Sequence, residues 1–246
     1  LEVLLSYVIV SLTMVYAVIL VLYIALHFTD WSENLLEPLL VSFATTVLIV
    51  YFLTYPIRNT LTVWFRLIFP KVLIVIVLYQ LVVSIMKVGE AGITHGRYFV
   101  ILFGLFAVMI ALIITFLPKK QWLVAPIFIS FSLLSITPPV DAFTISKNNQ
   151  ANLLQERLQS LNMFDGEIQP NSNISIEDKY FITEKFDYLQ HMDYDIPWLP
   201  NESFTRLFGF SPQYDSYMNE TYYTTHLKWG EPIIYPIESY DFFVKI

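Results

Sequence analysis

The chain has 246 residues, of which 56% are apolar and only 14% are charged, and its mean hydropathy is +0.56. Soluble domains carry more charge and fewer apolar residues, so this composition excludes a disordered chain and indicates a membrane protein. The net charge of −7 excludes a basic nucleic-acid binder, and the lack of cysteine excludes a disulfide scaffold.

The charged residues divide the chain near Pro139. Residues 1–139 hold 7 basic and 5 acidic residues, whereas residues 140–246 hold 7 basic and 16 acidic residues. A shift of this size marks a domain boundary. We therefore predict an all-α transmembrane domain over residues 1–139, followed by a small soluble, extracytoplasmic α+β domain over residues 140–246.

Five segments of the first domain are apolar enough to be transmembrane helices. A helix needs about 20 mostly apolar residues to cross the hydrocarbon core of a bilayer. The predicted spans cover approximately residues 3–27, 35–55, 63–86, 98–117 and 122–136. The last span is short, and the alternative for it is a re-entrant or interfacial segment.

The third span carries two basic residues, Arg66 and Lys71, on either side of Pro70. We expect both side chains to reach the lipid headgroups by snorkelling. The alternative is a charged helix face that lines a polar cavity. Pro70 would either kink this helix or mark its proper start, after an interfacial stretch.

The basic residues of the short loops predict the orientation, since cytoplasmic loops are richer in Lys and Arg. The loops after the second and fourth spans hold Arg58 and the pair Lys119–Lys120, so we place them in the cytoplasm. The acidic domain then lies outside. An outer domain without cysteine favours a bacterial source, so we predict a multi-pass protein of the bacterial cytoplasmic membrane.

The second domain is predicted to contain three helices and two or three short strands. Leucines at helical spacing predict a helix over residues 147–163, capped by Ser146. Ser175 caps a second helix that ends before Pro197, and Asn201 starts a short one near residues 201–208. The strands are expected in residues 221–246, which are rich in β-branched and aromatic residues.

Motifs for chemistry are missing from the sequence. It contains no nucleophile elbow, P-loop, dinucleotide fingerprint or zinc-protease motif, and its four histidines are scattered. We therefore assign no catalytic residue, metal or cofactor. The second domain does hold 9 Tyr and 9 Phe, and exposed aromatic faces bind glycans or partner proteins. The alternative is that these rings pack on the membrane surface.

The most distinctive segment is Gly92-Ile93-Thr94-His95-Gly96-Arg97-Tyr98, just before the fourth span. With Gly92, Thr94, Arg97 and Tyr98, it resembles the motif of the DUF4153 family, large bacterial polytopic membrane proteins of unknown function.

Three further segments resemble the same family over most of the chain. They are Asp141 to Ser146 with Gln150, then Asp187-Tyr188-Leu189, and lastly Ser239-Tyr240-Asp241-Phe242, where Ser and Phe depart from the family's closing Gly-Tyr-Asp-Tyr. The resemblance implies a bacterial envelope location and further spans upstream. It implies no activity and transfers no catalytic residue.

Arg97, at the head of the fourth span, and Asp141, just after the fifth span, are both expected on the outer side. The first interpretation is that Arg97 anchors its helix at the headgroups. One alternative, which we carry forward as a prediction, is an Arg–carboxylate bond between Arg97 and Asp141 that clamps the membrane domain to the outer domain. The other alternative is that the motif residues Gly92, Thr94, Arg97, Tyr98 and Asp141 form a ligand site.

The function that these features favour is a sensor, scaffold or accessory subunit that presents an outer domain to a partner. Its expected partners are the lipid bilayer and another envelope protein or a glycan. The first alternative is a transporter or channel component, although mid-membrane charges, which mark ion paths, are missing from four of the five spans. A membrane enzyme acting at the outer face is the second alternative.

Overall fold

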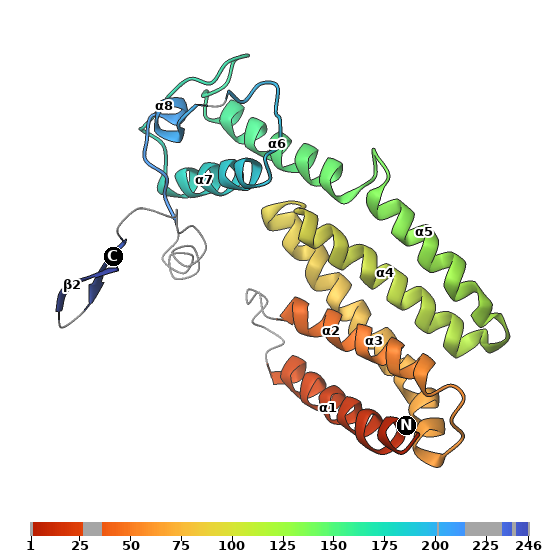
Figure 1. The fold of residues 1–246 in the computed structure, drawn as a ribbon. Helices are drawn as coiled ribbons and strands as arrows, with labels where there is room; N and C mark the ends of the chain where they lie inside the picture. The colour runs from red at the N-terminus through yellow and green to blue at the C-terminus, as the bar shows by residue number, and fades with distance from the viewer. Residues whose placement is uncertain (1, 27–35, 201, 215–232, 238–239, 246) are drawn as a thin grey trace. The chain divides into compact units, whose positions relative to one another are not determined.

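The computed structural model describes residues 2–26, 36–200, 202–214, 233–237 and 240–245 (Figure 1). Its contacts divide the chain into two compact units, residues 1–150 and residues 151–246. The boundary lies further along the chain than the predicted Pro139, because the first half of one helix packs with the first unit.

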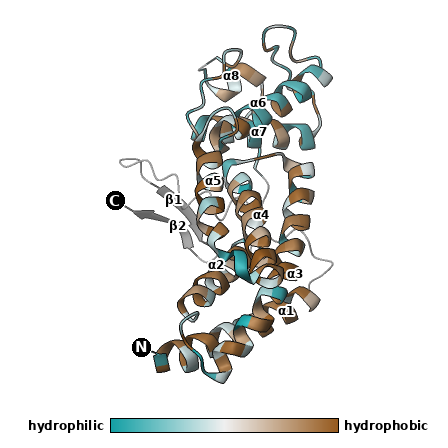
Figure 2. Ribbon diagram, turned by 90° about the vertical axis from the view of Figure 1, so that its right-hand side faces the viewer, coloured by the Kyte–Doolittle hydropathy of each residue, from teal (hydrophilic) through white to brown (hydrophobic). Residues whose placement is uncertain are grey.

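The first unit is built from apolar helices, which Figure 2 shows mainly in brown. A short π-helical stretch, η1, leads into α1, and a 3₁₀ helix, η2, leads into α5. The elements are η1 (Leu4–Ile9), α1 (Val10–Leu26), α2 (Leu36–Leu53), α3 (Thr60–Ala91), α4 (His95–Phe116), η2 (Pro118–Leu123) and α5 (Val124–Ile136).

Three of these helical segments are long and apolar enough to cross a membrane: Leu4–Leu26, Thr60–Ala91 and His95–Phe116. The other two helices, α2 and α5, are shorter than a membrane-spanning helix. The 13 residues of α5 rise about 20 Å, against a hydrocarbon core of about 30 Å. The structure therefore supports three membrane-length helices, and crossings by α2 and α5 remain predictions.

The helices of the first unit expose large apolar side chains on their outer surface. Leu12, Ile19, Val75 and Ile85 are each more than half exposed. A surface of this kind is unfavourable in water and matches lipid. The interior of the unit is apolar as well, with Phe43, Phe65, Leu73, Val77, Ala107 and Ile110 fully or almost fully buried.

The start of α3 contradicts the interpretation that Pro70 marks the proper start of the helix. The side chain of Asn59 accepts the backbone N–H of Thr62 at 2.9 Å and caps the helix, so α3 begins at Thr60 and Pro70 lies inside it. Arg66 donates to the backbone carbonyls of Thr54 and Ile57, the latter at 2.9 Å. Its positive charge thus stabilises the C-terminal end of α2.

The described part of the second unit is mostly helical. It contains the end of α6 (Ala142–Ser160), then α7 (Ile176–His191) and α8 (Phe204–Phe208), and an antiparallel hairpin of β1 (Ile233–Ile237) and β2 (Tyr240–Lys245). Residues 221–232 lie outside the described residues, so the α+β class of this domain remains a prediction.

The second unit has a capped helix, α7, and an aromatic core. The hydroxyl of Ser175 accepts the N–H of Asp178 at 3.1 Å, which confirms the predicted cap of α7. Helix α8 follows Ser203, and the predicted start at Asn201 lies outside the described residues. Phenylalanine rings supply much of the core, so part of the aromatic richness has a packing role; the buried rings are Phe186, Phe204, Phe208 and Phe210.

Candidate functional site: the loop between α3 and α4

Two motif residues shape the short connection from α3 to α4. Gly92 has a φ of 78°, a conformation that favours glycine, and its N–H donates to the carbonyl of Val88 at 2.9 Å to end α3. Thr94 caps the next helix, because its hydroxyl accepts the N–H of Arg97 at 3.3 Å. Gly92 and Thr94 therefore make the turn.

The next two motif residues tie this turn to its surroundings. The guanidinium of Arg97 donates to the carbonyl of Gly92 at 2.9 Å, which closes the loop on itself. The hydroxyl of Tyr98 donates to the carbonyl of Val140 at 2.5 Å and lies 3.4 Å from that of Leu134. Tyr98 thus links the start of α4 to the segment that follows α5.

Asp141 begins α6. Its Oδ1 atom accepts the backbone N–H groups of Phe143 at 3.0 Å and Thr144 at 2.9 Å, which is the pattern of a helix N-cap. The predicted start at residue 147 with Ser146 as the cap is therefore wrong. Asp141 takes that position first, and the Ser146 hydroxyl donates to the carbonyl of Phe143 at 3.2 Å.

The predicted bond between Arg97 and Asp141 is not formed. Within the described part of the chain no ion pair joins them. Each charge binds a nearer backbone group instead: Arg97 binds a carbonyl of the turn, and Asp141 binds the free N–H groups at the start of α6. Backbone groups left open at turns and helix ends compete well for charged side chains.

Two residues that sequence reasoning did not place in the site hold the loop from α6. The Oδ1 atom of Asn149 accepts the N–H of Ile93 at 2.6 Å. The Nε2 atom of Gln150, a fully buried side chain, donates to the carbonyls of Ala91 at 3.2 Å and Ile93 at 3.1 Å. We call Asn149 and Gln150 the loop clamp. Gln150 had one signal in the sequence, its place in the family resemblance.

Aromatic contacts reinforce the same joint. The ring of His95 stacks on that of Phe143, with 5.9 Å between centroids and an angle of 13°, and Phe99 meets Phe143 edge-on. Each of the side-chain hydrogen bonds described above is made with a backbone group. The arrangement is therefore suited to holding α4 and α6 together.

The described residues contain no candidate metal site. None of their His, Asp and Glu side chains form a group of three that could hold a metal ion. No family model, curated protein or solved structure matches the chain. The resemblance to the DUF4153 family thus remains a prediction.

The cap at Asp141 predicts a specific pH dependence. Hydrogen bonds from the side chain and then the backbone of Thr144 hold the pKa of Asp141 below its ordinary value. A lowered pKa adds stability above the unfolded value of about 3.9, and this stability is lost as the pH falls through the lower folded value. The wild-type melting temperature should therefore fall below about pH 4 more steeply than that of Asp141→Asn.

The Asn variant is the matched control, because Asn also caps helices but does not titrate. Thermal unfolding of both proteins in detergent between pH 3 and pH 7 measures the difference, and other carboxylates cancel in the comparison. If the gap between the two melting temperatures does not change with pH, the Asp141 cap does not contribute as a charge.

Proposed function

We propose that the protein is a polytopic protein of the bacterial cytoplasmic membrane that acts as a scaffold, sensor or accessory subunit. In this proposal its apolar helices present the acidic second domain, on the outer side, to another envelope protein or a glycan. The following observations support it.

The observation that carries the proposal is helix α6, which takes part in both units. Its first half holds the loop of the first unit through the loop clamp, Asn149 and Gln150. Its second half contributes Leu154 and Leu158, both fully buried, to the core of the second unit. A single helix that holds the loop of the first unit and contributes to the core of the second suits a protein that displays one domain from another.

The ends of α2 support a crossing by this helix. At its start, the carboxylate of Glu37 accepts the hydroxyl of Ser84 at 2.9 Å, and at its end the carbonyl of Thr54 accepts Arg66. Ser84 and Arg66 are 18 residues apart on α3, which is about 27 Å along a helix. Helix α2 thus extends along most of a helix that is itself of membrane length.

The segment from Pro118 to Ile136 extends along α4 in the same way. It starts directly after the C-terminal end of α4, where the N–H of Lys120 donates to the carbonyl of Leu117 at 2.8 Å. It returns to the start of α4, where Tyr98 meets Leu134. This path, which consists of η2 and α5, supports a fifth crossing.

The charges support the orientation. Arg58, Arg66, Lys119 and Lys120 lie at the end of the first unit where α2 and α4 finish and α3 begins. The loop between α3 and α4 lies at the other end. Because cytoplasmic ends are rich in Lys and Arg, this distribution of charge supports an outer location for the loop and the second domain.

Single cysteines test this proposal cleanly, since the chain has none of its own. We choose Asn34, Arg58, Lys119 and Ser172, and avoid Asn59 because its side chain caps α3. A membrane-impermeant thiol reagent should label Asn34→Cys and Ser172→Cys in intact cells. Arg58→Cys and Lys119→Cys should react only after permeabilisation.

Each pair of probes has its own meaning. Equal labelling of Asn34→Cys and Arg58→Cys would remove the crossing by α2, and equal labelling of Lys119→Cys and Ser172→Cys would remove the crossing by α5. Labelling of both Arg58→Cys and Lys119→Cys in intact cells, with Asn34→Cys and Ser172→Cys unlabelled, would reverse the orientation. Any result that places Ser172 in the cytoplasm contradicts the presentation of an outer domain.

A further inference from the structure

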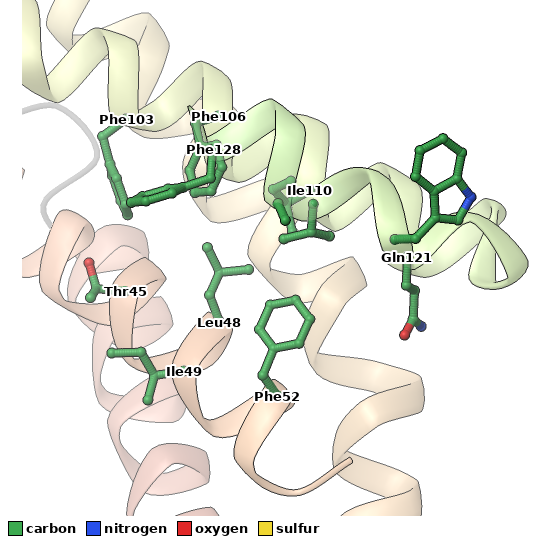
Figure 3. Close-up of a pocket in the computed structure, with 12 residues that line it drawn as sticks. Thr45, Leu48, Ile49, Phe52, Phe103, Phe106, Ile110, Gln121 and Phe128 are labelled. Carbon is green, nitrogen blue, oxygen red and sulfur yellow. The ribbon is translucent and has the colours of Figure 1, made fainter. Parts of the chain in front are cut away.

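An apolar groove of about 550 Å³ lies on the first unit (Figure 3). It arises because α2 and α5 both pack against α4 and leave a space between them. Its size falls within the range of small-ligand sites, about 300–1,000 Å³.

Apolar side chains form the walls of the groove. Leu48 and Phe52 point into it from α2, and Ile110 lies opposite on α4 (Figure 3). At one end, the rings of Phe106 and Phe128 meet edge-on, with 5.8 Å between their centroids. Such walls exclude a polar ligand and suit a hydrocarbon chain.

Few polar side chains line the groove, and they are hydrogen-bonded within the protein. The hydroxyl of Thr45 donates to the carbonyl of Val41 in its own helix. Gln121 lies at the opposite end from the phenyl rings (Figure 3) and donates to the hydroxyl of Tyr51 at 3.0 Å. The groove therefore has an apolar end and a polar end.

The polar end carries positive charge. Lys119 and Lys120, both exposed, directly precede Gln121, and Trp122, which is 70% exposed, also lines the groove. Tryptophan is enriched where lipid headgroups begin, and clusters of Lys next to transmembrane helices attract anionic lipids. The charge at this end thus complements a phosphate group.

We propose that the groove binds one acyl chain of an anionic phospholipid from the surrounding bilayer, with the phosphate beside Lys119 and Lys120. The inference rests on the proposed crossing by α5, which brings these lysines to the headgroups. It goes beyond the scaffold role by assigning a ligand site to the membrane helices.

Native mass spectrometry of the detergent-solubilised protein tests this site. Phosphatidylglycerol and phosphatidylcholine with identical chains serve as the anionic and neutral probes. The wild type should retain one phosphatidylglycerol molecule and bind it more tightly than phosphatidylcholine. At about 1 kcal/mol for each lysine near the phosphate, the double variant Lys119→Gln/Lys120→Gln should bind phosphatidylglycerol roughly 30-fold more weakly. The variant Arg58→Gln, which removes another exposed base, should bind as the wild type does.

A second variant tests the groove itself. Ala125 is exposed and lines the groove, so the ring in Ala125→Phe should fill it and lower the affinity for both lipids. Ser132→Phe adds the same ring to an exposed position of α5 outside the lining and should have no effect. Size-exclusion chromatography confirms that the variants are intact.

Two results would overturn the proposal. The first is equal binding of both lipids with no change in the lysine and Ala125 variants. The second is a dimer that Ala125→Phe converts to a monomer, because the occupant would then be a second copy of the chain. Neither result alters the cysteine labelling pattern, so the failure of this inference is separate from the failure of the proposed function.

Discussion

Gly104→Leu should destabilise the detergent-solubilised protein by about 1–3 kcal/mol, the usual cost of overpacking a well-filled interior, and should lower its melting temperature by several degrees. Gly89→Leu should leave the melting temperature at or somewhat above that of the wild type, because the exposed helix position gains helix propensity without overpacking. Differential scanning fluorimetry of the purified proteins measures both values.

The contact between α3 and α4 is the reason for this expectation. A Cβ atom added at Gly104 would lie 2.7 Å from Cδ2 and 3.1 Å from Cγ of Leu81, and 3.3 Å from Nε2 of Gln80. Leu81 and Gln80 are both buried, and Gln80 also donates to the carbonyl of Val100 on α4. A leucine side chain would therefore force the two helices apart and strain this hydrogen bond.

Small residues continue along the same face of α4. Ala107 and Ala111 are completely buried, and small residues at such spacing let membrane helices approach closely. Packing of this kind holds membrane helices together, since lipid is as apolar as their side chains. Gly104 lies at the start of this row, where added volume has no space to occupy.

Gly89 is the matched control because it also lies inside a helix, and the gain in helix propensity from Gly to Leu applies to both positions. A Cβ atom there would meet no atom within 4 Å. Equal melting temperatures of the two variants would show that the α3–α4 contact tolerates the extra side chain.

The sequence predicted the apolar helices well and their ends less well. The third predicted span, residues 63–86, corresponds to a helix from Thr60 to Ala91. Lys87 and Glu90 lower the hydropathy of its last turns, but they do not break a helix. The helix ends where Gly92 takes a positive φ. Its end is therefore determined by backbone conformation, whereas hydropathy indicates only the apolar part of the helix.

The candidate site was predicted in part. Gly92 and Thr94 form a turn with their neighbours in the sequence, and a local sequence pattern can indicate such a turn. The partner of Ile93 is Asn149, 56 residues away. Nothing in a local pattern says which distant side chain meets a loop, and the most obvious pairing by charge, Arg97 with Asp141, proved wrong for that reason.

Arg66 illustrates the same limit. Its charge within an apolar span predicted either snorkelling or a polar cavity. Its partners are the carbonyls of Thr54 and Ile57, in the connection that directly follows α2. Carbonyls at a helix end lack intrahelical donors, but which side chain donates near that end depends on how α2 and α3 pack.

Gln150→Leu should be the most damaging single change in the loop clamp. Leucine keeps the size and the helix propensity of the glutamine, so packing and α6 itself are preserved. It removes both hydrogen bonds to the loop, including the one that the partly buried carbonyl of Ile93 accepts. Loss of a hydrogen-bond partner at such a site costs about 1–3 kcal/mol, so the melting temperature in detergent should fall by several degrees.

Hydrogen exchange gives a local readout that separates the clamp from general destabilisation. In Gln150→Leu, the amides of Ile93 and of the first turn of α4 should exchange faster, whereas those in the middle of α4 should follow the small global change. Asn148→Leu is the control, because Asn148 is exposed on the same turn of α6 and should change neither quantity. If Gln150→Leu behaves like Asn148→Leu, the loop is held by the bonds of Gly92, Thr94 and Arg97 alone, and α6 is not anchored to the first unit through Gln150.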